Sequence, residues 1–197
     1  MRSIWDFIVE PVGSRYNNVK KVDGEKELII NSEISNHQFV NRKAIVVETP
    51  IAYKGRVKKG DEVIVHHNIF RRWYNVRGEE KNSKAFLEDN KYLAQLDQVY
   101  LYKNSDSWEC PDGYCFVQPI KDKSVLSTNT EKPLVGIVKY SDGSVKEGEL
   151  VGFKPNSEFE FVIDGKRLYR VMSHYITIKY EYQGDEEEYN PSWAQSS

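Results

Sequence analysis

Short runs of apolar residues, many of them alternating with polar ones, follow one another along the chain and predict β-strands. In the N-terminal half they predict strands at 4–12, 39–48, 62–65 and 99–102. In the C-terminal half they predict strands at 114–120, 134–140, 149–153, 158–163, 166–171 and 175–182. Asp164-Gly165 separates two of these runs and predicts a type I′ hairpin turn, because Gly tolerates the positive φ that the turn requires. The pattern indicates an all-β protein.

Two stretches of this pattern occur twice. The segment VKKGDEV at 57–63 reappears as VKEGELV at 145–151, and the opening strand FIVEPV at 7–12 matches CFVQPI at 115–120. In the first copy the position equivalent to the Asp-Gly turn is Gly78. A longer loop at 79–90 follows it, in which we expect a short helix at 85–87. The chain is therefore a degenerate internal repeat.

The copies differ in the loop between these two elements. Val12 and Val57 are 45 positions apart, whereas Ile120 and Val145 are 25 apart, so the first copy carries about 20 additional residues. Insertions in repeats fall in loops on a shared core, and loops are where binding residues are expected.

This repeat divides a chain of 197 residues into two small units. Five or six short strands in about 70 residues are too few for a two-sheet sandwich, whereas a closed barrel removes exposed edges. We predict two tandem β-barrels at 1–105 and 114–182, joined by a linker at 106–113, with an acidic, disordered tail at 183–197.

Composition narrows the functional classes. Charged residues make up 29% of the chain and the mean hydropathy is −0.66, which is typical of a soluble protein. No apolar run approaches the roughly 18 residues of a membrane helix, and the N-terminus lacks the pattern of a secretion signal, so a cytoplasmic location is expected. The net charge of −2 gives no general attraction to nucleic acid, although it leaves room for a local basic patch.

No residue pattern predicts a metal site or a cofactor. Cys110 and Cys115 are the two cysteines, and their C-x4-C spacing is not that of zinc knuckles or redox motifs; reduced thiols are expected in a cytosolic protein, and a single disulfide in an exported one. His66 and His67 are adjacent, so on a strand they point to opposite faces and do not chelate together. No catalytic motif stands out, and we predict that the chain is not an enzyme.

The repeated unit resembles the GroES-type co-chaperonin family. An opening strand that ends in hydrophobic-x-Pro leads into a long loop, a second strand at 44–47, and a V-K-x-G-D-x-V segment at 57–63. In the second copy, DGK at 164–166 and LYRVMS at 168–173 are similar to the family's closing hairpin and ending. The resemblance extends over nearly all of residues 1–180 at low identity and implies two GroES-like barrels.

The resemblance also implies a function. In this family the long loop is mobile, and its aliphatic tip docks into a groove on a large chaperonin ring. The corresponding loop here is at 14–38, and Leu28, Ile29 and Ile30 take the place of the tip; the shortened loop of the second copy has Val125 and Leu126 as a secondary tip. The expected partners are a GroEL-type chaperonin, unfolded client proteins and further copies of the chain in a ring, and neither a nucleic acid nor a membrane is an expected partner. The expected location is the cytoplasm or, for a viral protein, the host cytoplasm.

The physical chemistry of the loop is compatible with docking through Leu28, Ile29 and Ile30. A polar loop rich in Asn, Lys, Glu and Ser buries too little apolar area to order itself, and burial in a partner groove contributes roughly 1.5–3 kcal/mol per aliphatic side chain. The alternative, that 28–30 is an ordinary buried strand, is favoured by the pattern alone, whereas its position in the one extra insertion favours docking.

The chain also departs from the family. Its members are normally single barrels in a seven-fold ring, and covalent pairs of barrels do not divide evenly into seven. The hairpins that form the roof of the family's dome are expected near 48–56 and 140–144, and both segments are short. These departures favour a divergent, viral co-chaperonin with an altered dome.

Three rival interpretations remain open. A zinc dehydrogenase with a related barrel would need zinc ligands and a nucleotide-binding fold, and neither motif is present. A nucleic-acid-binding module is indicated by Arg71-Arg72-Trp73-Tyr74, although on a strand only alternate residues share a face, and a barrel edge with extended arginines is the simpler explanation. A structural or assembly protein of a virus would oligomerise without a chaperonin.

Overall fold

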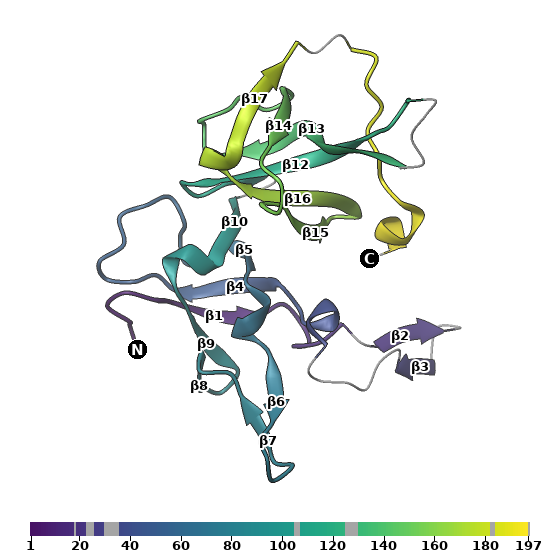
Figure 1. Cartoon of the computed structure of the whole chain (residues 1–197). Helices are drawn as coiled ribbons and strands as arrows, with labels where there is room; N and C mark the ends of the chain where they lie inside the picture. Colours follow the sequence, from purple (N-terminus) through teal and green to yellow (C-terminus); the bar gives the residue numbers. More distant parts are fainter. Residues whose placement is uncertain are drawn as a thin grey trace. The chain divides into compact units, whose positions relative to one another are not determined.

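The computed structural model of the chain describes residues 1–17, 19–22, 26–29, 36–104, 107–124, 130–181 and 184–196. In this part of the chain the secondary structure consists of β-strands and short 3-10 helices, without an α-helix, so the all-β prediction is confirmed (Figure 1). The chain divides into two compact units, Met1–Ser107 and Trp108–Ser197.

The first unit is built on a sheet with the strand order β11-β10-β5-β4-β1-β9-β8. Two further two-stranded ribbons, β2-β3 and β6-β7, form sheets of their own. The strands are β1 (Phe7–Pro11), β2 (Val19–Val22), β3 (Lys26–Ile29), β4 (Lys43–Glu48), β5 (Glu62–Val65), β6 (Arg72–Tyr74), β7 (Glu80–Asn82), β8 (Phe86–Glu88), β9 (Lys91–Ala94), β10 (Val99–Asn104) and β11 (Ser107–Glu109), the last of which spans the boundary between the units. The 3-10 helices are η1 (His37–Phe39), η2 (His67–Ile69) and η3 (Leu96–Gln98).

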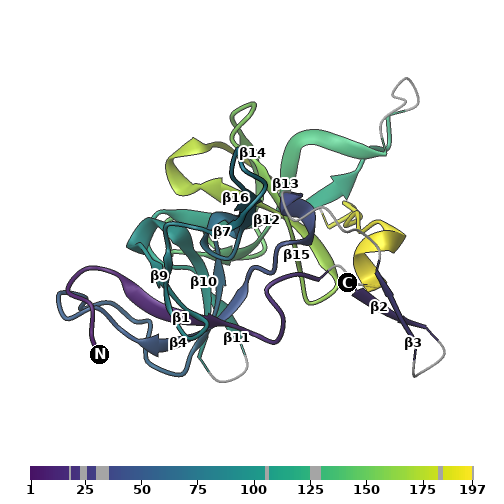
Figure 2. The same ribbon diagram turned by 90° about the horizontal axis from the view of Figure 1, so that it is seen from below.

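The second unit is a six-stranded sheet with the order β15-β16-β12-β13-β14-β17. Its strands are β12 (Tyr114–Lys121), β13 (Glu131–Ser141), β14 (Leu150–Phe153), β15 (Phe159–Ile163), β16 (Lys166–Met172) and β17 (Ile176–Tyr180), and its 3-10 helices are η4 (Ser173–Tyr175) and η5 (Ser192–Ser196). Both views show β12 and β13 extending together as a curved two-stranded arm (Figures 1 and 2).

The two units share one topology, which supports the duplication inferred from the sequence. Reading β8-β9-β1-β4-β5-β10 against β15-β16-β12-β13-β14-β17 pairs all six strands of the second unit's sheet with counterparts in the first. The first strand of each unit also carries a register shift at the same place, between Ile8 and Val9 and between Phe116 and Val117. A β-bulge at the same position in both copies is an inherited feature of the fold.

The repeated V-K-x-G-acid segment is a hydrogen-bonded turn into β5 and β14. Gly60 N donates to Val46 O at 2.8 Å, and Gly148 N donates to Val138 O at the same distance. Gly60 and Gly148 have φ of +91° and +83°, values that glycine adopts without strain. The acidic side chain that follows accepts a hydrogen bond from the backbone N–H three residues earlier, from Lys58 in the first copy and Lys146 in the second. Asp61 and Glu149 thus stabilise a turn, as their shared position suggests.

Each unit has its own apolar core, built from the alternating inward positions of its strands. In the first unit Phe7, Val9, Val46, Val63 and Tyr92 are among the buried members. In the second, the members are Val117, Val138, Val151, Phe153 and Val171. Burial of such side chains supplies the main driving force for folding at roughly 25 cal/mol per Å².

Several local predictions differ from the structure. The expected helix at 85–87 falls on strand β8, and 71–82 form a β6-β7 hairpin that the sequence pattern did not reveal. The Asp164-Gly165 turn has positive φ at both residues, as type I′ requires. The strand orders run from one edge strand to another, and no described pairing joins β15 to β17, so the closed barrels stay a prediction.

The acidic tail, expected to be disordered, is docked on the second unit where the structure describes it. Lys121 N donates to Glu187 O at 2.8 Å and Tyr189 N donates to Pro119 O at 2.8 Å, so 187–189 lie beside the end of β12 (Figure 1). The side chain of Asn190 accepts from Arg167 N and donates to Gly165 O, each at 2.9 Å. The tail is ordered by main-chain pairing, which composition does not reveal.

No helix in the described residues is long and apolar enough to cross a membrane. Cys110 and Cys115 are free thiols, and both are buried. Burial raises the pKa of Cys110 well above its ordinary value. Buried thiols of this kind are typically unreactive.

Asp142 connects three parts of the second unit through its carboxylate. Oδ2 accepts from Gly113 N at 2.8 Å and from the Ser173 hydroxyl at 2.6 Å, and Oδ1 accepts from Ser144 N at 2.9 Å. Partial burial acts to raise the pKa of Asp142, but these hydrogen bonds outweigh it and lower the pKa below the ordinary value of 3.8.

We therefore expect Asp142→Asn to lower the free energy of unfolding by about 1 kcal/mol at neutral pH, because the amide nitrogen cannot accept these hydrogen bonds. A depressed pKa in the folded protein adds stability above pH 3.8 that is lost as the pH falls through that lower pKa. Urea unfolding should therefore separate the two proteins at neutral pH and bring them together in strong acid. Asp89→Asn is the control, because Asp89 is exposed and its positive φ suits Asn. An equal loss at both pH values would contradict this account.

Candidate functional site

The loop after the first strand begins from a rigid base in the first unit. Tyr16 bridges to Val40 across the loop, and both side chains are buried. Asn17 N donates to Phe39 O at 2.7 Å, and Asn41 N donates to Arg15 O at 2.9 Å. The loop expected at 14–38 is therefore closed off at Tyr16–Val40, and only the residues between these two extend beyond the base.

Asn41 holds this base together from inside. Its side chain is 3% exposed, and its Nδ2 donates to the carbonyl oxygens of Val12 and Ser14, both at 2.8 Å. Its Oδ1 accepts from Lys43 N at 2.9 Å. A single buried amide thereby joins the end of β1, the start of the loop and the start of β4.

Beyond the base, the described part of the loop is a two-stranded hairpin. β2 and β3 pair antiparallel, with Val19 opposite Ile29 and Lys20 opposite Leu28 (Figure 1). Leu28 and Ile29, two of the three predicted tip residues, are thus on β3, whereas Ile30 lies outside the described residues. The predicted irregular loop is a hairpin, and the docking role of its three aliphatic residues stays a prediction.

In the second unit the equivalent loop begins at the end of the β12-β13 arm. Lys121 pairs with Glu131, and Asp122 N donates to Thr130 O at 3.3 Å. The predicted secondary tip residues, Val125 and Leu126, lie outside the described residues. The shorter loop therefore also starts from a paired base.

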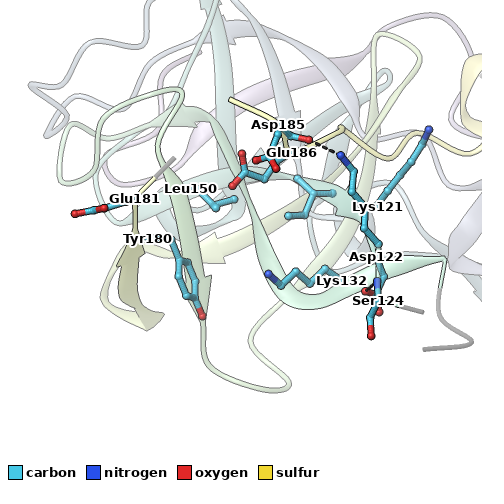
Figure 3. Close-up of a pocket in the computed structure, with 11 residues that line it drawn as sticks. Lys121, Asp122, Ser124, Lys132, Leu150, Tyr180, Glu181, Asp185 and Glu186 are labelled. Carbon is cyan, nitrogen blue, oxygen red and sulfur yellow. Dashed lines mark hydrogen bonds between the residues drawn. The ribbon is translucent and has the colours of Figure 1, made fainter. Parts of the chain in front are cut away.

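A pocket of about 590 Å³ lies at this base (Figure 3). Figure 3 shows Asp185 and Glu186 of the tail together on one side of it and Lys132 and Tyr180 on the opposite side. Lys121, Lys123 and Leu150 complete much of the remaining lining. The site combines side chains of both signs of charge with the apolar groups of Ile120, Leu150 and Tyr180.

Two of the lysines that line this pocket form ion pairs with the tail. Lys121 Nζ contacts Glu187 at 2.7 Å, and Lys123 Nζ contacts the same carboxylate at 3.5 Å. Lys139 forms an ion pair with Glu188. The hydrogen bond from Lys121 is the main cause that lowers the pKa of Glu187. The acidic residues of the tail thus act as fixed counter-ions for the lysines beside this loop.

A second charged cluster joins the loop base to β16. Arg167 lies between Glu131 at 2.5 Å and Glu160 at 2.6 Å, and the Tyr169 hydroxyl donates to Glu131 at 2.6 Å. Burial and the hydrogen bond to Glu131 raise the pKa of Tyr169 well above its ordinary value. Every member is hydrogen-bonded within the cluster, so we assign it a structural role in holding Glu131, the first residue of β13.

The described residues contain no group of three or more His, Cys, Asp or Glu side chains arranged to hold a metal ion. The sequence pattern did not reveal the roles of Asn41 and of the tail, since neither belongs to the repeated segments.

No protein-family model matches the chain, and no curated protein is similar to it in sequence. The functional assignment therefore depends on the residues of this chain and on its geometry.

Asn41→Ala should lower the free energy of unfolding by about 2–3 kcal/mol, because it removes three hydrogen bonds of a buried side chain, those to Val12 O and Ser14 O and the one from Lys43 N. Chemical denaturation measures this difference. Asn17→Ala is the matched control, because the Asn17 side chain is exposed, and it should change stability by less than about 0.5 kcal/mol. Equal effects of the two substitutions would refute the role assigned to Asn41.

Proposed function

We propose that this protein is a co-chaperonin of the GroES type that caps a large chaperonin ring and assists ATP-dependent folding of client proteins. The single observation that carries the proposal is the duplicated unit whose first strand leads, from a rigid base, into an extra hairpin that carries Leu28 and Ile29. By the resemblance to the GroES-type family, these residues correspond to the aliphatic tip that docks on the ring. ATP hydrolysis belongs to the partner.

The construction of the loop suits transient docking. β2 and β3 pair only with each other among the described strands, so few contacts tie the hairpin to the core. The hydrogen bonds at Asn17 and Asn41 keep the base in place when the hairpin moves. A ligand-binding hairpin with few contacts to the core rearranges at a low cost in free energy. A stable base keeps the hairpin at a defined position.

Capping also needs several copies of the loop, since a single aliphatic tip binds weakly after the cost of ordering is subtracted. The six-stranded sheet ends in the edge strands β15 and β17, on which Phe159 and Ile178 are 55% and 50% exposed. Exposed edge strands with apolar side chains favour association with further strands. These edges support a homo-oligomer in which several loops bind one ring together.

The main rival is a structural or assembly protein of a virus, which would use the same edge strands for oligomerisation. It differs in having no need of the loop or of a chaperonin. An experiment on the loop therefore separates the two functions.

The test is co-purification of the chain with a GroEL-type ring, with and without ATP. Wild type should be retained only with nucleotide, and Ile29→Asp should lower retention at least about tenfold, because a carboxylate cannot enter an apolar groove without a large desolvation cost. The melting temperature of Ile29→Asp should equal that of wild type.

Ile51→Asp is the control, because Ile51 is an exposed isoleucine of the first unit outside the loop, and it should be retained as wild type is. Unfolding of Ile29→Asp would show that the side chain belongs to the core. Retention of the folded Ile29→Asp variant would exclude the docking role.

A further inference from the structure

A cavity of about 520 Å³ in the first unit has a chemistry quite different from that of the pocket at the tail. It lies beside β6, and its polar and aromatic lining consists of Asn68, Arg71, Trp73, Ser83, Lys84 and Gln98. No carboxylate is among the lining residues. The cavity volume lies within the range of about 300–1,000 Å³ that is typical of small-ligand sites.

The two cations of this cavity have no acidic partner. Neither Arg71 nor Lys84 forms an ion pair with any described residue, and the Nε of Arg71 is buried without a hydrogen-bond partner there. A buried donor without an acceptor costs free energy, which an anionic ligand would recover. Lys121 and Lys123, by contrast, form ion pairs with Glu187 of the tail.

Strand geometry separates the four residues Arg71-Arg72-Trp73-Tyr74 into two pairs. Arg72 forms an ion pair with Glu80 at 2.9 Å and lies over the Tyr16 ring at 4.8 Å, so it belongs to the packing of the loop base. Arg71 and Trp73, two positions apart, both line the cavity. One arginine is structural, and the other is free to bind.

Trp73 adds an aromatic surface. Its side chain is 47% exposed, so part of the ring is accessible to a ligand. An aromatic ring beside two unpaired cations suits a ligand that has both a planar ring and a phosphate, since bases stack on tryptophan and phosphates bind Arg and Lys. The amides of Asn68 and Gln98 can hydrogen-bond the edge of a base.

We propose that this cavity binds one nucleotide of a single-stranded nucleic acid, with the phosphate on Arg71 and Lys84 and the base stacked on Trp73. Neighbouring nucleotides would follow the β6-β7 hairpin, on which Tyr74 is 58% exposed and Lys81 lies opposite Trp73 in the strand register. A duplex keeps its bases stacked on one another and cannot offer one to Trp73. This site is independent of the proposed chaperonin-docking loop.

The test measures binding of the full chain to a fluorescently labelled single-stranded oligouridylate by anisotropy. Wild type should bind at about 50 mM salt and weaken steeply as salt rises. Arg71→Gln, Lys84→Gln and Trp73→Ala should each weaken binding about tenfold, and the two charge variants should also reduce the salt dependence by about one unit of log–log slope.

The matched controls are Lys54→Gln and Trp5→Ala, which remove an exposed lysine and an exposed tryptophan of the first unit outside the cavity and should bind as wild type does. If Trp73→Ala lowers the melting temperature, Trp73→Phe replaces it and should retain most of the binding, because an aromatic face remains. Absence of wild-type binding, equal effects of cavity and control variants, or equal affinity for a duplex or for free uridine monophosphate would each overturn the proposal.

Discussion

The structure depends on one constraint that occurs in both units: the first strand is paired along both of its edges. β1 lies between β4 and β9, and β12 lies between β13 and β16, so both are interior strands of their sheets. Their inward residues, such as Val9 and Val117, are fully buried. Each strand carries a bulge after Ile8 or Phe116 and then stays paired with β4 or β13, and the variable loop begins beyond the end of this pairing.

The two copies differ in the segment after that bulge. In the first unit, the Asn41 amide and the Tyr16–Val40 bridge close the base, and the chain then forms the β2-β3 hairpin. In the second unit, β12 stays paired with β13 to Lys121, and the C-terminal tail occupies the opposite edge of β12 where β16 has ended. The same frame thus supports a projecting hairpin in one copy and a covered arm in the other.

The two units also differ in the ion pairing of the cations at their proposed or expected loop and cavity sites. The lysines at the base of the second loop have glutamates of the tail as partners, whereas Arg71 and Lys84 of the first unit have none among the described residues. The proposed ligand would supply the acceptor that the buried Nε of Arg71 lacks among the described residues. The first unit therefore carries both proposed binding sites. The second unit supplies the edge strands β15 and β17 and a loop base at which Lys121 and Lys123 are paired with Glu187 of the tail.

The sequence by itself determined the strands, the Asp164-Gly165 turn and the duplication, because alternation, positive-φ glycine and repeated motifs are local properties. The short helix at 85–87 and the disordered tail were wrong for the described residues, because strand pairing overrode local propensity at β8, and backbone partners on β12 ordered the acidic segment. Only the tertiary structure decided which arginine of Arg71-Arg72 is paired, and that Asn41 holds the loop base. Asn41 bonds the carbonyl of Ser14 and Arg72 lies over the Tyr16 ring, and no local pattern encodes contacts between residues so far apart in the chain.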